Sequence, residues 1–148
     1  MRLIIQRVKK AIVTDRDKRM LVGEIGNGLF VLIGIKKGDS KKEADYLAEK
    51  LIKLRVMSDR NEKMNLSIRD VKEEILVVSQ FTLYGETKGQ NRPSFINAEN
   101  PEKAEQLYDY FIEKLRELNI KVKTGSFGNY MEITPILDGP VTIIVDSK

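Results

Sequence analysis

The sequence has no histidine and no cysteine among its 148 residues. Without histidine it lacks the commonest general base near neutral pH, and Ser-His-Asp or Cys-His catalysis within the chain is excluded. The usual zinc ligand sets and disulfides are excluded as well. Any catalysis must therefore use hydroxyls, carboxylates, lysines, backbone dipoles or the substrate itself, and we expect neither a cofactor nor a metal.

Long apolar segments are also missing. No apolar run approaches the roughly 20 residues needed to cross a membrane. The apolar stretch near the N-terminus, Leu3 to Ile5, is too short for the core of a signal peptide. Because the absence of cysteine also fits a reducing compartment, the sequence predicts a cytoplasmic protein with no membrane partner.

Length and composition are those of an ordinary globular protein. Hydrophobic residues make up 41% of the chain and charged residues 32%. No repeat, linker or low-complexity tract is visible, so we predict a single domain over residues 1–148. The net charge of +4 is compatible with a polyanionic partner such as RNA, but many soluble proteins carry a charge of this size.

Apolar patterning predicts many strands and two main helices. The expected strands cover residues 3–8, 10–14, 20–25, 29–35, 75–78, 120–122, 130–136 and 141–145. Residues 29–35 and 75–78 are almost wholly apolar, so these strands should be buried on both faces. A capping box at Ser40 opens one helix, and Asn100-Pro101 opens another that ends near Leu118. Runs of strands with two helices predict an α+β domain with a mainly antiparallel sheet.

The first segment that could carry chemistry follows the apolar strand at 75–78. It consists of Ser79, Gln80, Phe81 and Thr82. If strand alternation continues, Gln80 and Thr82 point to one side and the other two residues to the opposite side. These residues cannot all enter a core without hydrogen-bond partners. The alternative is a strand that runs out into a polar turn, with Phe81 in the core.

Three further segments each have an ordinary structural explanation. Residues 88–95 form a basic loop with Lys88 and Arg92, which either contacts phosphates or is simply solvated. Residues 124–131 predict a tight entry into a strand, and residues 138–142 a turn before the last strand. The Gly139-Pro140 bond in that turn could be cis, as about 5–6% of such bonds are.

Together, the order and spacing of these four segments resemble the D-aminoacyl-tRNA deacylase family, once called D-tyrosyl-tRNA deacylases. The resemblance spans essentially the whole chain. Its most specific parts are residues 79–83 and 139–142, which match at the expected separation. Further matching segments are residues 1–8, 92–95, 104–111 and 124–125.

The resemblance implies a β-rich, barrel-like homodimer whose active site lies at the dimer interface. Ser79, Gln80, Phe81 and Thr82 would line the catalytic pocket, partly through their backbone groups. Met131 matches a methionine of that pocket. The family pattern departs at 128–130, where alanine is frequent, and this leaves the loop shape and the preferred tRNA open.

The resemblance also implies that the Gly139-Pro140 bond is cis and enters the pocket of the partner subunit. Its carbonyls would bind the amino group of a D-residue and leave no room for an L side chain. Arg7 matches the arginine that braces this motif. Leu137 stands where the family often has asparagine, which bears on loop shape rather than on the reaction.

The resemblance implies hydrolysis of D-aminoacyl-tRNA at its 3′ end, releasing the D-amino acid and tRNA, with glycyl-tRNA mischarged on tRNA-Ala as a second expected substrate. Lys88 and Arg92 are the candidate tRNA contacts. The ester needs modest catalysis, which positioned N–H groups and the ribose 2′-hydroxyl can supply. A rival hypothesis makes Thr82 a nucleophile. The alternative function is a non-catalytic nucleic-acid-binding module of the same fold.

Overall fold

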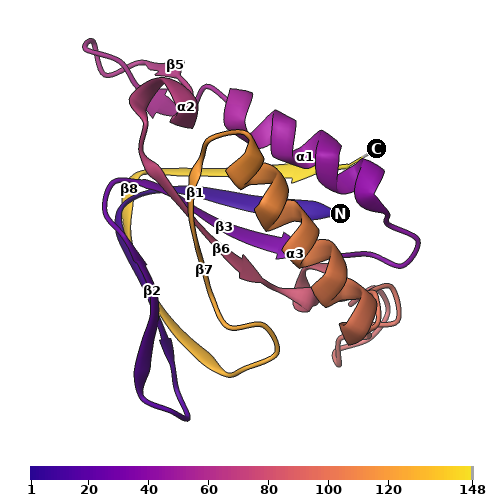
Figure 1. The fold of residues 1–148 in the computed structure, drawn as a ribbon. Coiled ribbons are helices and arrows are strands. Elements are labelled where there is room, and N and C mark those ends of the chain that lie inside the picture. The colour runs from indigo at the N-terminus through magenta and orange to yellow at the C-terminus, as the bar shows by residue number, and fades with distance from the viewer. Residues whose placement is uncertain (148) are drawn as a thin grey trace.

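A long first strand, β1 (Arg2–Asp15), organises the sheet in this computed structural model, which describes residues 1–147. The first half of β1 pairs antiparallel with β3 (Gly28–Gly34), and its second half pairs antiparallel with β2 (Met20–Ile25). The opposite edge of β1 pairs with β8 (Met131–Asp146), which runs antiparallel along both halves (Figure 1).

The remaining strands of the main sheet are parallel to one another. Strand β6 (Glu74–Ser79) pairs with β3, and β7 (Lys121–Thr124) pairs with β6. The sheet is therefore mixed, with antiparallel pairs around β1 and parallel pairs where long helical crossovers return the chain in the same direction. The predicted β-rich α+β class is confirmed, with this parallel portion added.

The two ends of the sheet approach each other between β2 and β7. A Cβ atom on Gly23 of β2 would lie only 2.5 Å from the carbonyl oxygen of Thr124 in β7. Glycine permits this contact because it has no side chain to collide with the neighbouring backbone. The sheet therefore curls into the nearly closed, barrel-like form that was expected.

Both predicted main helices form, and they cover one face of the sheet (Figure 1). Helix α1 (Lys41–Lys53) begins at the capping box of Ser40. Helix α3 (Pro101–Glu117) begins at Asn100, whose side chain accepts a hydrogen bond from the backbone N–H of Lys103 at 3.0 Å. The smaller elements are β4 (Met57–Ser58), β5 (Met64–Leu66), α2 (Ile68–Val71) and the 3₁₀ helix η1 (Phe81–Tyr84).

Two apolar clusters hold the fold together. The larger lies between the sheet and the helices and includes Leu51, Phe111 and alternate residues of β6, such as Val77. The smaller lies on the inner face of the curled sheet and takes the other residues of β6, such as Val78. Strands β3 and β6 are therefore buried on both faces, as their apolar composition predicted. None of the helices in residues 1–147 has the length and hydrophobicity to cross a bilayer.

Strand β8 corrects one expectation. The sequence predicted two strands separated by a turn at residues 138–140, but β8 continues through them as one strand. On one side of this segment Leu137 pairs with Val8, and on the other Thr142 pairs with Gln6. Residues 138–141 therefore bulge opposite Arg7 alone, because both halves of β8 pair with the same long neighbour.

Candidate active site

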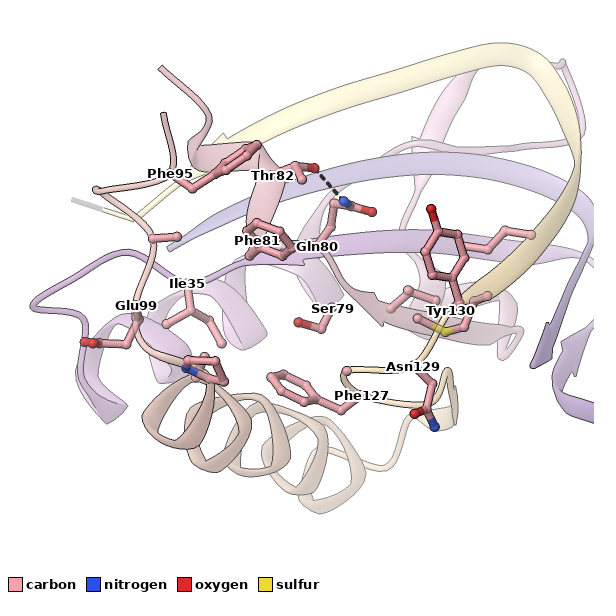
Figure 2. A pocket seen from close by; sticks show the side chains of 17 residues that line it. Ile35, Ser79, Gln80, Phe81, Thr82, Phe95, Glu99, Phe127, Asn129 and Tyr130 are labelled. Carbon is pink, nitrogen blue, oxygen red and sulfur yellow. Dashed lines mark hydrogen bonds between the residues drawn. The ribbon is translucent and has the colours of Figure 1, made fainter. Parts of the chain in front are cut away.

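A cavity of about 740 Å³ opens at the carboxyl end of β6. Its walls come from the end of β6, from η1, from the start of α3 and from residues 127–131 before and in β8 (Figure 2). The sequence placed candidate residues on two of these segments, 79–82 and 124–131, and the fold brings the two together. Most of the lining is apolar, with a few hydroxyl, amide and backbone groups among it.

The segment after β6 does not continue as a strand. The N–H of Gln80 donates to the carbonyl of Ile33 at 2.8 Å, and the chain then turns into η1. The predicted alternation of side chains beyond Ser79 is therefore wrong, and so is the alternative with Phe81 in the core. The Phe81 ring is 56% exposed and meets the edge of Phe95, with ring centres 5.0 Å apart.

This turn places hydrogen-bond donors in the residues that line the cavity. The side-chain amide of Gln80 donates to the hydroxyl oxygen of Thr82, which leaves the Thr82 O–H free to donate in turn. The N–H groups of Phe81 and Thr82 open η1, and the first N–H groups of a helix have no acceptor within it. The hydroxyl of Ser79 lies in the middle of the cavity (Figure 2).

The opposite wall is fixed by Met131 and its neighbours. The sulfur of Met131 accepts a hydrogen bond from the N–H of Ser126 at 3.3 Å. Phe127 packs against Tyr108, whose hydroxyl donates to the carbonyl of Val77 at 2.9 Å. Burial raises the pKa of Tyr108 well above its usual range, so this hydroxyl stays protonated and structural.

Glu99 lines the cavity and escaped the sequence analysis. Its carboxylate accepts hydrogen bonds from the ammonium of Lys103 and from the N–H of Asn100, both at 2.9 Å. The Lys103 hydrogen bond lowers the pKa of Glu99, and the carboxylate points away from the cavity (Figure 2). It is therefore not placed to activate Thr82. The only feature of the sequence that singles out Glu99 is its position directly before the helix cap Asn100. That position indicates a structural role.

A second group of predicted residues assembles elsewhere. The guanidinium of Arg7 donates to the carbonyl of Val56 at 2.9 Å and to the hydroxyl of Ser58 at 3.1 Å. It also forms an ion pair with Asp138 at 3.1 Å, directly before the bulge. The Gly139-Pro140 bond is cis, and Gly139 has a φ of +123°, which favours glycine.

The two groups lie at opposite ends of the parallel strands. Arg7 pairs with Leu29 at the start of β3, and Leu29 pairs with Ile75 at the start of β6. The cavity instead opens at Ser79, four residues or about 13 Å further along β6. One copy of the chain therefore does not bring Gly139-Pro140 into its own cavity.

Lys88 and Arg92 lie outside the cavity wall. They are exposed residues of the loop that follows η1, which an antiparallel bridge between Glu86 and Ser94 closes. Phe95 follows this loop and contacts Phe81, so the loop is attached to the cavity rim. Within residues 1–147, no group of three acidic side chains is arranged to hold a metal ion.

Comparison with known proteins gives a consistent result for the sequence. The family model described as D-Tyr-tRNA(Tyr) deacylase matches residues 4–146. A D-aminoacyl-tRNA deacylase of Thermosipho melanesiensis is 50% identical, over 100% of this chain and 98% of its own length. A D-aminoacyl-tRNA deacylase of Bacillus cytotoxicus is 48% identical over 100% of both chains.

Two solved structures share the fold. The c-Myc DNA Unwinding Element Binding Protein superposes with a TM-score of 0.93 at 39% identity, over 100% of this chain and 99% of that one. A structure described as that of a probable eukaryotic D-amino acid tRNA deacylase superposes with a TM-score of 0.83 over 98% of both chains. At 18% identity, the second likeness concerns the fold alone.

Proposed function

Because this chain belongs to the D-aminoacyl-tRNA deacylase family, we propose that it hydrolyses the ester joining a D-amino acid to the terminal ribose of tRNA. The products are the free D-amino acid and tRNA, and we expect the reaction to take place in the cytoplasm. The observation that carries this proposal is the cavity at the end of β6. Its mostly apolar lining includes the hydroxyl residues Ser79 and Thr82 and the amide of Gln80, which suits an activated ester.

In the proposed mechanism, water attacks the ester carbonyl while the N–H groups of Phe81 and Thr82 donate to the forming oxyanion. The water oxygen bonds to the carbonyl carbon, the ester C–O bond breaks, and the ribose oxygen leaves with a proton. The neighbouring ribose 2′-hydroxyl can assist from within the substrate. Ser79 and Gln80 complete the wall that orients the ester, so catalysis rests on positioning and fixed dipoles.

Thr82 serves as a positioning group in this proposal. A threonine nucleophile needs a base that removes its proton. The chain has no histidine, and Glu99 is held by Lys103 and Asn100 with its carboxylate turned outward. The Thr82 oxygen also accepts a hydrogen bond from Gln80, which favours a hydroxyl that orients the substrate over one that attacks it.

We further propose that two copies form a homodimer in which Gly139-Pro140 of each enters the other's cavity. The separation of this segment from its own cavity supports the idea, as does the anchoring of the adjacent Asp138 by Arg7. Large apolar side chains stand exposed on both sides of the bulge, with Ile136 51% and Ile144 62% accessible. Carbonyls of the entering segment would bind the amino group of a D-residue, and an L side chain would collide with them.

A comparison of D-Tyr-tRNA, L-Tyr-tRNA and glycyl-tRNA-Ala tests the proposal directly. We expect rapid release of D-tyrosine, release of glycine because it has no side chain to collide, and no release of L-tyrosine. Similar rates for both tyrosine enantiomers would contradict the stereochemical part. Binding of tRNA without any cleavage would instead support a non-catalytic nucleic-acid-binding module, an alternative favoured by the name of the 39% identical DNA-unwinding-element relative.

Lys88 and Arg92 are proposed to contact the tRNA backbone next to the cavity. Phosphate contacts add affinity without sequence preference, and they weaken with salt. Replacing both residues with glutamine should raise the KM for D-Tyr-tRNA while turnover at saturation changes little. An unchanged KM at low salt would remove these two residues from the binding surface.

A further inference from the structure

Tyr130 is an aromatic side chain held in solvent at the rim of the cavity. Its ring is 64% exposed and stands across the opening from Phe95 (Figure 2). Its backbone is fixed, because its carbonyl accepts a hydrogen bond from the N–H of Arg16 at 2.9 Å. The preceding turn is closed by a bond from Asn129 to the carbonyl of Ser126 at 3.3 Å. The ring therefore lies on the surface at the cavity opening and is not part of the core.

The guanidinium of Arg16 covers one face of this ring. The central carbon of the guanidinium lies 3.7 Å from the ring centre, which is the geometry of a cation–π contact. Arg16 belongs to the turn between β1 and β2, and the buried carboxylate of Asp15 stiffens this turn. That carboxylate accepts hydrogen bonds from the N–H groups of Asp17 at 3.0 Å and Lys18 at 2.9 Å.

The same turn carries further positive charge. Lys18 and Arg19 are both exposed beside Arg16, and Asp17 is the one exposed carboxylate among them. A rigid aromatic ring next to several cations is the combination by which proteins hold single-stranded RNA, because bases stack on the ring and phosphates meet the cations. The alternative is that the contact between Arg16 and Tyr130 only stabilises the hairpin. That role would not require the ring to lie at the cavity opening.

The size of the cavity indicates which nucleotide reaches this ring. A volume of about 740 Å³ falls in the range that encloses a whole drug-sized ligand. In the proposed dimer the substrate shares this space with Gly139-Pro140 of the partner subunit, and we assign the remainder to the aminoacyl group and the terminal nucleoside. The next nucleotide along the RNA then has to cross the rim.

We propose that Tyr130, backed by Arg16, stacks on the base of the nucleotide that precedes the terminal one. Lys18 and Arg19 then meet the phosphates beyond that base. This inference rests on the proposed function, because the RNA is that of an aminoacyl-tRNA. It assigns substrate binding to a surface outside the ester-cleaving wall.

Binding of uncharged RNA tests the stacking without catalysis. The probe is an RNA hairpin with a single-stranded CCA end, and the readout is fluorescence anisotropy. Tyr130→Ala should weaken binding about 5- to 100-fold, since stacking on one base contributes that much. Tyr130→Phe should stay within about twofold of the parent, and Tyr130→Leu should be as weak as the alanine variant. Tyr46→Ala is the matched control, because Tyr46 is also an exposed tyrosine but lies on α1, outside the cavity wall.

Salt dependence separates the ring from the cations. Lys18→Gln should reduce the slope of log affinity against log salt by about 0.7, the value for one phosphate contact on a single strand. Tyr130→Ala should lower the affinity and keep the slope of the parent. Lys50→Gln, a change of an exposed lysine on α1, should alter neither quantity.

Hydrolysis identifies the nucleotide. With D-tyrosyl-adenosine and D-Tyr-tRNA as substrates, Tyr130→Ala should raise the KM for the tRNA at least about five times more than that for the adenosine ester. Equal increases for both esters overturn the assignment, as does tight RNA binding by Tyr130→Ala or full rescue by Tyr130→Leu. If the parent protein cleaves neither ester, the proposed function fails, and the RNA-binding series still decides the stacking.

Discussion

At the level of single residues, a substitution of Thr82 tests whether this residue positions the substrate or acts as a nucleophile. Its oxygen accepts from Gln80, and its backbone N–H lies in the first turn of η1 whatever side chain is present. Thr82→Val keeps the shape and removes the hydroxyl, so hydrolysis of D-Tyr-tRNA should remain within about tenfold of the parent. Thr87→Val in the exposed loop serves as control. Complete loss of turnover with intact binding would instead indicate an acyl-enzyme.

Replacing the carboxylate of Glu73 with an amide should stabilise the fold. One of its carboxylate oxygens is buried without a hydrogen-bond partner in residues 1–147. This desolvation, with the nearby charge of Asp138, raises the pKa of Glu73. A carboxylate whose pKa is higher in the folded than in the unfolded chain makes the fold less stable above that pKa, and the penalty disappears as pH falls through it.

Glu73→Gln is therefore expected to raise the free energy of unfolding at pH 7 by up to about 0.5 kcal/mol, a figure reduced for solvent screening. The gain should shrink towards zero at acidic pH, where the native carboxyl is protonated. Thermal unfolding of both proteins at pH 7 and at pH 4 measures the difference. Glu105→Gln on the exposed side of α3 is the control. A less stable Glu73→Gln protein at pH 7 would contradict this account.

At the scale of the element, the start of α3 links stability to the cavity. Asn100 caps the helix, and Pro101 and Ala104 of its first turn line the cavity wall. Asn100→Ala should lower the free energy of unfolding by about 1 kcal/mol and let this wall shift. We therefore expect a KM for D-Tyr-tRNA about two- to fivefold higher.

Helix α1 offers a matched comparison. Ser40→Ala removes a cap of the same kind at a helix start that does not line the cavity. It should cost a similar free energy of unfolding and leave the KM at the parental value. Equal KM changes in the two variants would show that only global stability matters.

The elements that could be predicted are those whose signals are local. A few neighbouring residues are enough to identify the helix caps at Ser40 and Asn100. The same holds for the apolar runs of β3 and β6. The single strand β8 was not predicted, because its continuity depends on pairing with β1, more than a hundred residues away in the chain. The turn after Ser79 was missed for a related reason, since its first bond goes to Ile33.

For the whole molecule, the decisive prediction concerns association. The proposed dimer should have about twice the 17.0 kDa chain mass in light scattering. Ile144→Glu places a charge at an exposed apolar side chain of β8, so we expect monomers and loss of D-Tyr-tRNA hydrolysis. Tyr46→Glu removes an exposed apolar side chain from α1 and should change neither property. A parent protein that is monomeric and fully active would contradict the shared site.

Some of the predicted site residues could be identified from the local sequence pattern, and others only from the family resemblance. Ser79 to Thr82 attracted notice because polar residues follow a buried strand, and the cavity lies at that point. The grouping of Arg7 with Gly139-Pro140 had no local signal and came from the family resemblance alone, and the ion pair with Asp138 is a finding of the structure. No spacing rule links Arg7 to a segment at the other end of the chain, because only the pairing of β1 with β8 brings them together.

The bulge at residues 138–141 also affects whether further chains can add to the free edge of β8. Within residues 1–147, β8 is paired along one edge only, and it is 16 residues long. A long, regular strand with a free edge is a template for open-ended growth into fibres. The bulge divides this edge into two shorter, differently directed runs of main chain, so a third molecule finds no continuous row of amides to extend. By this argument, the segment proposed to select the hand of a substrate would also limit strand addition along this edge.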